Sequence, residues 1–150
     1  MKKLLFVIAI ALFTCIETHA QIEYKVVTSV ESVVPNGFGR SRIISGNEDK
    51  NYKDYTSTQT EEDNKRNKSE RGDIRVKDFD ETKLLNFFNI GGISFQNIAA
   101  NDAVISSKIN TMIADGWELA FVTSAVESDA GKGDGNGIFI TRFIFKRNKL

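Results

Sequence analysis

The chain holds few side chains of the kinds that act as nucleophiles or proton carriers, and their positions limit the reactions open to it. Its one cysteine, Cys15, and its one histidine, His19, both lie within the first twenty residues. Ser-His-Asp and Cys-His arrangements need a histidine as the base, and the usual zinc sites draw on cysteine and histidine. If residues 1–20 are removed, only carboxylates, lysines, serines and tyrosines remain for catalysis.

One loop, residues 127–137, combines alternating glycines with acidic side chains. Asp129, Asp134 and Asn136 could offer oxygen ligands to calcium. Their spacing does not match an EF-hand, and Lys132 would oppose a bound cation. Alternating glycines are also what a flexible hairpin connection contains, because glycine adopts positive backbone angles at little cost. We therefore predict a hairpin loop, with the calcium site as the alternative, and we predict no cofactor.

The first twenty residues have the layout of a secretory signal. Lys2 and Lys3 precede an unbroken apolar run from Leu4 to Phe13, and a small residue, Ala20, stands before Gln21. A positive start, a short apolar centre and a small residue at the cleavage site define such signals. The ten-residue run is too short to cross a bilayer, which takes roughly 20 residues. We expect cleavage after Ala20 and a protein of the periplasm or the medium.

Cys15 gives an alternative location. The segment Leu12-Phe13-Thr14-Cys15 resembles a lipoprotein box, in which lipid is attached to the cysteine. Threonine and phenylalanine are unfavourable before that cysteine, so the unanchored form is preferred. Under either cleavage no free thiol survives, and the fold cannot use disulfides.

The length of the chain suits one small domain, and its net charge favours neither an acidic nor a basic partner. The chain has 20 basic and 20 acidic residues, and removal of residues 1–20 leaves 18 and 19. Near-neutral charge gives no reason to expect nucleic acid as a partner. The remaining residues 21–150 suit a single domain. No later apolar stretch is long enough to predict a transmembrane segment.

The remaining sequence opens with a strand and then a polar insert. Residues 22–30 alternate with period two, which is typical of a half-buried strand. Residues 45–72 contain almost no large apolar side chains, and such a segment cannot bury enough surface to become ordered, so we predict a mobile polar insert. A short strand is expected around Ile74 and Val76. The side chains expected to face the core from the first strand are Ile22, Tyr24, Val26, Thr28 and Val30.

One helix is predicted clearly, and a second is possible. Ile105, Ile109 and Met112 recur at helical spacing, which predicts a main helix over about 102–115 with Asn101 or Asp102 as its N-cap. Gly116 can end it in the left-handed conformation, and the next residue, Trp117, is then expected to pack back on Met112 as a core anchor. A possible short second helix covers about 81–89, begun by Asp80.

Two further strands complete the expected fold. Residues 118–127 and 138–146 alternate between two largely apolar faces and are joined by the glycine-rich loop, so they predict an antiparallel hairpin. The economical arrangement is an α+β domain in which a small antiparallel sheet of three to five strands carries the main helix on one face.

This order of elements resembles a family of small bacterial proteins known only as a domain of unknown function. The resemblance rests on Glu23-Tyr24-Lys25-Val26-Val27, on Asp115-Gly116-Trp117-Glu118-Leu119 and on Phe143-Ile144-Phe145-Lys146-Arg147. It covers the first strand and about the last third of the chain, while the polar insert departs from the compact family form. The family brings no activity, and its shared residues imply structural roles. Its exported members resemble Gram-negative bacterial proteins.

These observations favour a non-enzymatic binding or interaction domain in the periplasm or at the cell surface, whose partner is a protein or a small ligand. Two alternatives stay open. The first is a carboxylate-dependent, hydrolase-like enzyme, which requires two acids that converge in a pocket. The second is a structural subunit of an envelope assembly, which requires self-association or a fixed partner.

Overall fold

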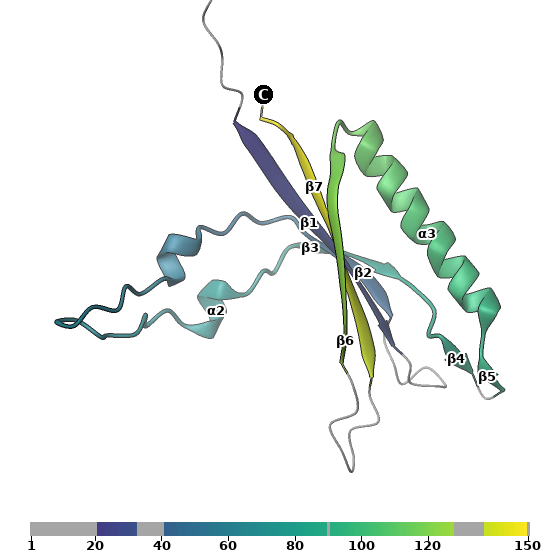
Figure 1. Ribbon diagram of the computed structural model, residues 1–150, viewed down its shortest axis with the longest axis horizontal. Helices are drawn as coiled ribbons and strands as arrows, with labels where there is room; N and C mark the ends of the chain where they lie inside the picture. Colours follow the sequence, from purple (N-terminus) through teal and green to yellow (C-terminus); the bar gives the residue numbers. More distant parts are fainter. Residues whose placement is uncertain (1–20, 33–40, 90, 128–136, 150) are drawn as a thin grey trace, which may run out of the picture.

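The computed structural model describes residues 21–32, 41–89, 91–127 and 137–149. Five strands form one antiparallel sheet in the order β3-β2-β1-β7-β6, and helix α3 covers one of its faces (Figure 1). This confirms the predicted α+β class, with one main helix on a small antiparallel sheet. The sheet strands are β1 (Ile22–Ser32), β2 (Arg42–Gly46), β3 (Phe79–Lys83), β6 (Glu118–Glu127) and β7 (Ile138–Asn148).

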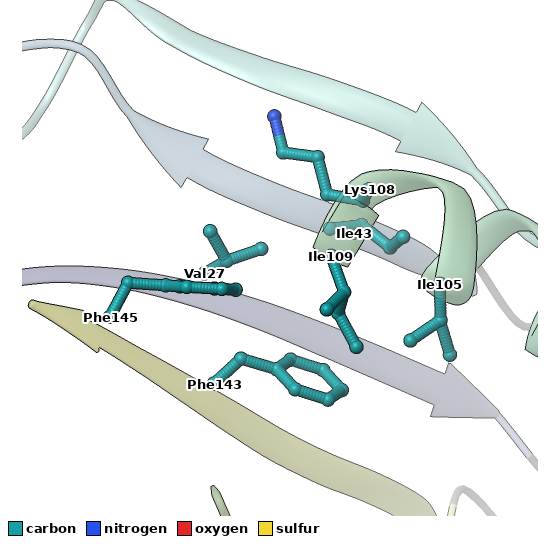
Figure 2. A pocket seen from close by; sticks show the side chains of 7 residues that line it. All are labelled: Val27, Ile43, Ile105, Lys108, Ile109, Phe143 and Phe145. Carbon is teal, nitrogen blue, oxygen red and sulfur yellow. The ribbon is translucent and has the colours of Figure 1, made fainter. Parts of the chain in front are cut away.

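The core lies between α3 (Phe95–Ala114) and the middle of the sheet. Phe145 is fully buried, and Val27 and Ile43 are 2% and 3% exposed. Figure 2 shows Ile105 and Ile109 of the helix pointing at these sheet residues, and the space between the two layers is too narrow for a water molecule. Burial of this apolar surface is the main stabilising contribution that the described residues show.

Helix α3 begins earlier than its periodicity suggests. Ser94, rather than Asn101 or Asp102, is the N-cap, and its side chain accepts a hydrogen bond from the backbone N–H of Asn97. Asn101 lies inside the helix and is 1% exposed. The prediction of a helix starting near 102 was wrong because Phe95, in the first turn, is 78% exposed and adds nothing to the apolar stripe.

The face of β1 that meets the helix is the opposite of the predicted one. Val27 and Ser29 are buried beneath α3, whereas Tyr24 and Val26 are 63% and 45% exposed. In the register with β7, Val27 lies opposite Phe143, which belongs to the core. The expectation that Ile22 to Val30 would line the core with their even-numbered side chains was therefore wrong. Small residues on the helix-facing side of β1 leave room for the rings of β7.

The segment expected to form a short second helix over 81–89 contains strand instead. β3 pairs with β2 along its whole length, from Gly46 opposite Phe79 to Arg42 opposite Lys83. Two-residue strands β4 (Phe88–Asn89) and β5 (Gly92–Ile93) then form a separate small hairpin. Leu84 is buried at 3% exposure while its neighbours cross from the sheet toward α3. Pairing with β2 overrode the helical spacing of the apolar residues.

Residues 47–78, named the arm here, project from the ends of β2 and β3 (Figure 1). The arm contains a short 3-10 helix, η1 (Tyr52–Tyr55), and a four-residue helix, α2 (Arg71–Ile74), neither with a buried residue. Polar bonds join its two limbs: the Tyr55 hydroxyl donates to the Asp73 carbonyl at 2.9 Å. The strand expected around Ile74 and Val76 is absent from these described residues, because a capping box of Glu70 and Asp73 begins a helical turn there. Mobility of residues 45–72 stays a prediction.

The end of α3 is closed by two backbone bonds. The Gly116 N–H donates to the Ile113 carbonyl and the Trp117 N–H to the Met112 carbonyl, each at 3.0 Å. Gly116 has a φ of 84°, the left-handed conformation that this helix ending requires. Over the residues that the structure describes, no helix is both long enough and apolar enough to cross a membrane.

Candidate functional site

The sheet face turned away from α3, named the helix-free face, carries an apolar row that crosses the sheet. Val26 of β1 lies opposite Ile144 of β7, and Ile144 lies opposite Phe121 of β6. On the other side of β1, Gly46 of β2 lies opposite Phe79 of β3. Phe121 and Phe79, on the two edge strands, are 61% and 47% exposed. A contiguous apolar patch of this kind marks an interaction surface more often than chance exposure does.

An apolar hollow of about 340 Å³ opens on this face at the root of the arm. Gly46 lies at its floor. A Cβ atom added to Gly46 would have one neighbour within 4 Å, the Cγ1 of Val76 at 3.9 Å, so the space above this residue is empty. A glycine within a strand leaves a gap in the side-chain layer and allows close approach by another molecule. Its lining residues are Val26, Thr28, Ile44, Gly46, Val76 and Phe79.

A charged cleft of about 420 Å³ adjoins the hollow and shares Val26 and Gly46 with it. It follows the first part of β1, beyond the point where β2 stops pairing, because the β1–β2 register covers only Val27 to Val30. The cleft is lined in addition by Glu23, Tyr24, Lys25, Asn47, Glu48, Asp49, Trp117 and Arg147. Glu23 and Lys25 share the face of Val27, and Arg147 lies opposite Glu23, so these charged side chains belong to the helix-facing side of β1. The cleft and the hollow therefore meet only at Val26 and Gly46.

Arg147 and Trp117 form a fixed wall of the cleft. The Arg147 guanidinium lies 4.2 Å from the centre of the Trp117 ring, a cation–π contact. Its Nε also donates to the Glu23 carboxylate. Trp117 is half-buried, packs against the core cluster that includes Met112, and follows the helix-ending glycine. The wall is therefore held by both α3 and β7.

Glu48 fixes the base of the arm against the cleft. One carboxylate oxygen, Oε1, accepts the backbone N–H groups of Lys77 and Asp78 at 2.6 and 2.7 Å. The second, Oε2, pairs with Lys50 at 3.1 Å. The hydrogen bonds from Asp78 and Lys77, followed by the bond from Lys50, lower the pKa of Glu48 below its usual value. Glu48 is thus ionised at neutral pH and engaged on both oxygens.

Glu31 is the carboxyl group whose burial favours the protonated form, and it lies outside the cleft. Desolvation raises the pKa of Glu31, with a smaller contribution from the charge of Asp102, while a hydrogen bond from Asn101 acts against the rise. Glu31 is not among the residues that line the cleft or the hollow. A general acid at neutral pH needs a raised pKa beside the substrate. Glu48 lies in the cleft but has a lowered pKa, and Glu31, whose pKa is raised, lies outside it.

The candidate calcium ligands Asp129, Asp134 and Asn136 lie outside the described residues. Within the described ranges, no three Asp, Glu, His or Cys side chains are grouped so that they could hold a metal ion. The structural triplet Gly116, Trp117 and Met112 lies at the end of α3, where Trp117 also lines the cleft.

Sequence reasoning missed the hollow because it assigned the faces of β1 in reverse. A usable signal was present: β6 and β7 are largely apolar on both faces, and one helix can cover only one face of the sheet. No family model, no curated protein and no solved structure matches this chain. The resemblance to the domain of unknown function stays a prediction.

Proposed function

We propose that the chain is an exported, non-enzymatic binding domain that holds a partner protein in the periplasm or at the cell surface. The apolar hollow on the helix-free face carries this proposal. Val26 and Phe79 are 45% and 47% exposed at its rim, and Gly46 leaves its floor open. Covering one large apolar side chain contributes about 1.5–3 kcal/mol, so a partner that fills the hollow gains substantial free energy.

The hollow and the cleft that meets it at Val26 and Gly46 indicate the kind of partner. The hollow has room for one aliphatic or aromatic side chain, and the adjoining cleft offers Lys25, Asp49 and the Arg147 wall to polar groups. Binding sites on proteins commonly join an apolar anchor pocket to a polar rim. We therefore infer a protein partner that inserts an apolar side chain beside charged neighbours. Export is supported by the layout of residues 1–20.

A carboxylate-dependent enzyme remains the second candidate, because Glu23, Glu48 and Asp49 line one cleft. Two of these acids already hold partners: Glu23 pairs with Arg147, and Glu48 binds the base of the arm. This engagement favours binding over catalysis. Turnover on a broad hydrolase panel that Asp49→Asn abolishes, with the fold intact by circular dichroism, would reverse the order of the two candidates.

Site-specific photo-cross-linking tests the binding proposal. A benzophenone amino acid is placed at Ile44 on the helix-free face, in the cells that produce the protein, and a matched probe is placed at Ser106 on α3. We expect a discrete adduct from position 44 and none from position 106. Equal adducts from both positions, or none from 44, would reject this face as the binding surface. Mass spectrometry of the purified protein should find Gln21 as its first residue, and an uncleaved or lipid-modified N-terminus would contradict the proposed form.

A further inference from the structure

The two edges of the sheet differ in how they are protected. β3, at one edge, has five residues and carries Asp80, Glu81 and Lys83. β6, at the other edge, has ten residues and no charge between Glu118 and Glu127. Charged side chains and short length are the usual means by which an edge strand avoids pairing with another chain. β3 has both means of protection, and β6 has neither over its central eight residues.

β6 is also open to solvent on its outer edge and on both faces. Every described residue of the strand except Leu119 is exposed, including Val122 at 44% and Val126 at 60%. Figure 1 looks onto this edge, and no described segment is drawn in front of β6. A β-bulge between Leu119 and Phe121 disturbs one end, but the register with β7 is regular from Phe121 to Glu127. A straight seven-residue edge is therefore available for pairing.

We propose that β6 pairs antiparallel with β6 of a second copy of this chain and joins two sheets into one of ten strands. The identity of the pairing strand, β6 of a second copy, follows from the sequence of β6 itself. A two-fold axis perpendicular to the sheet keeps side chains on matching faces, so residues of equal parity lie opposite each other. With the axis at Thr123, Phe121 lies opposite Ala125 on one face, and Val122 lies opposite Ser124 on the other. Each large side chain thus meets a small one.

Charge permits the same register. Thr123 lies opposite itself across the axis, and the residues that pair in this register, 121–125, carry no charge. Glu118 is paired within its own chain to Lys146 at 3.2 Å. Five residues of each chain, 121–125, pair in this register within the regular part of the strand, and they bury less than the roughly 800 Å² per partner of a standard interface. The dimer is accordingly a reversible one, with its dissociation constant in the micromolar range.

Sedimentation velocity from about 1 to about 500 µM tests the proposal on the full chain. We expect a concentration-dependent dimer. Thr123→Glu places two acids opposite each other across the axis and should weaken the dimer roughly tenfold. Within one chain the new acid faces Arg142 of β7, so the monomer should keep its stability. Thr82→Glu, the same change on the charged edge strand β3, is the matched control and should leave the dimer unchanged.

If Thr123→Glu unfolds the chain, formation of an interchain disulfide tests the same pairing. In a Cys15→Ser background, Thr123→Cys should form an interchain disulfide under mild oxidation, because directly opposed residues of an antiparallel pair lie within disulfide reach. Thr82→Cys should not. A monomer at all concentrations, or a dimer that neither Thr123 substitution affects, would overturn the proposal. These outcomes are independent of the hollow, since Gly46 lies two strands away from β7 and three from β6.

Discussion

Replacement of Asn101 by alanine should remove the main polar connection between α3 and the chain that crosses to it. The side chain is 1% exposed and makes three hydrogen bonds. Its Oδ1 accepts from the Leu85 N–H at 2.8 Å, and its Nδ2 donates to the Leu85 carbonyl at 2.8 Å and to Glu31 Oε1 at 2.9 Å. Loss of Asn101 leaves both backbone groups of Leu85 without these partners.

The magnitude follows from these three bonds. Each contributes about 1 kcal/mol net, and alanine returns about 0.6 kcal/mol of helix propensity. We expect the free energy of unfolding to fall by about 2.5 kcal/mol, which lowers a urea midpoint by about 1 M for a slope near 2 kcal/mol/M. Asn97→Ala is the matched control in the same helix, since its side chain donates one bond, to the Asn86 carbonyl at 2.8 Å.

Urea unfolding followed by circular dichroism compares the two variants. The helix-propensity gain is common to both, so their difference, about 2 kcal/mol, isolates the two extra bonds of Asn101. Asn101→Asp keeps an acceptor for the Leu85 N–H but sets a carboxylate beside Glu31, so it should lose more stability at pH 7 than at pH 4. A difference below about 0.5 kcal/mol between the two alanine variants would refute the role given to Asn101.

Three smaller changes test other parts of the fold by thermal melting. Gly116→Ala should cost about 1 kcal/mol, because the cost of its φ of 84° is purely conformational and nothing lies within 4 Å of an added Cβ; an unchanged melting temperature would contradict the left-handed ending. Ser29→Ala should raise stability, since its hydroxyl is buried without a hydrogen-bond partner, and a lower melting temperature would show an unrecognised bond. The folded-state pKa of Glu31 is raised, so its protonation stabilises the fold, and that contribution is present in acid and lost as pH rises through the folded pKa. Glu31→Gln, which keeps an acceptor for Asn101, should therefore be more stable than the parent at neutral pH and equal to it in acid, and a gain that does not vary with pH would contradict the assignment.

The fold class could be predicted because the long segments obey a single period. The β6–β7 hairpin follows from two apolar segments joined by a glycine-rich loop, and the end of α3 follows from Gly116; both are local signals. The second helix over 81–89 failed because Leu84 and Leu85 mark a crossing of the core rather than one face of a helix. Local spacing cannot distinguish these arrangements when a neighbouring strand is available for pairing.

The candidate site could not be predicted from local pattern. The apolar phase of β1, from Ile22 to Val30, is the one that α3 leaves uncovered, so the period shows the strand but predicts the wrong face. The face is set by the neighbouring strands: Phe143 of β7 lies opposite Val27, and Ile43 of β2 lies opposite Ser29, and both belong to the core beneath α3. The hollow further depends on Val76, which the arm brings back to Gly46 across 30 residues of chain.

The central claim is that a partner binds through the hollow. Its most direct test is the yield of the photo-cross-linked adduct from position 44 after a substitution has filled the hollow. Gly46→Leu adds a side chain that occupies the hollow, and Gly72→Leu makes the same change where nothing lies within 4 Å of the added Cβ. Both variants should fold, which circular dichroism checks. The account predicts that Gly46→Leu abolishes the adduct from the probe at Ile44 while Gly72→Leu preserves it. An adduct of undiminished yield in Gly46→Leu would contradict a partner held through the hollow.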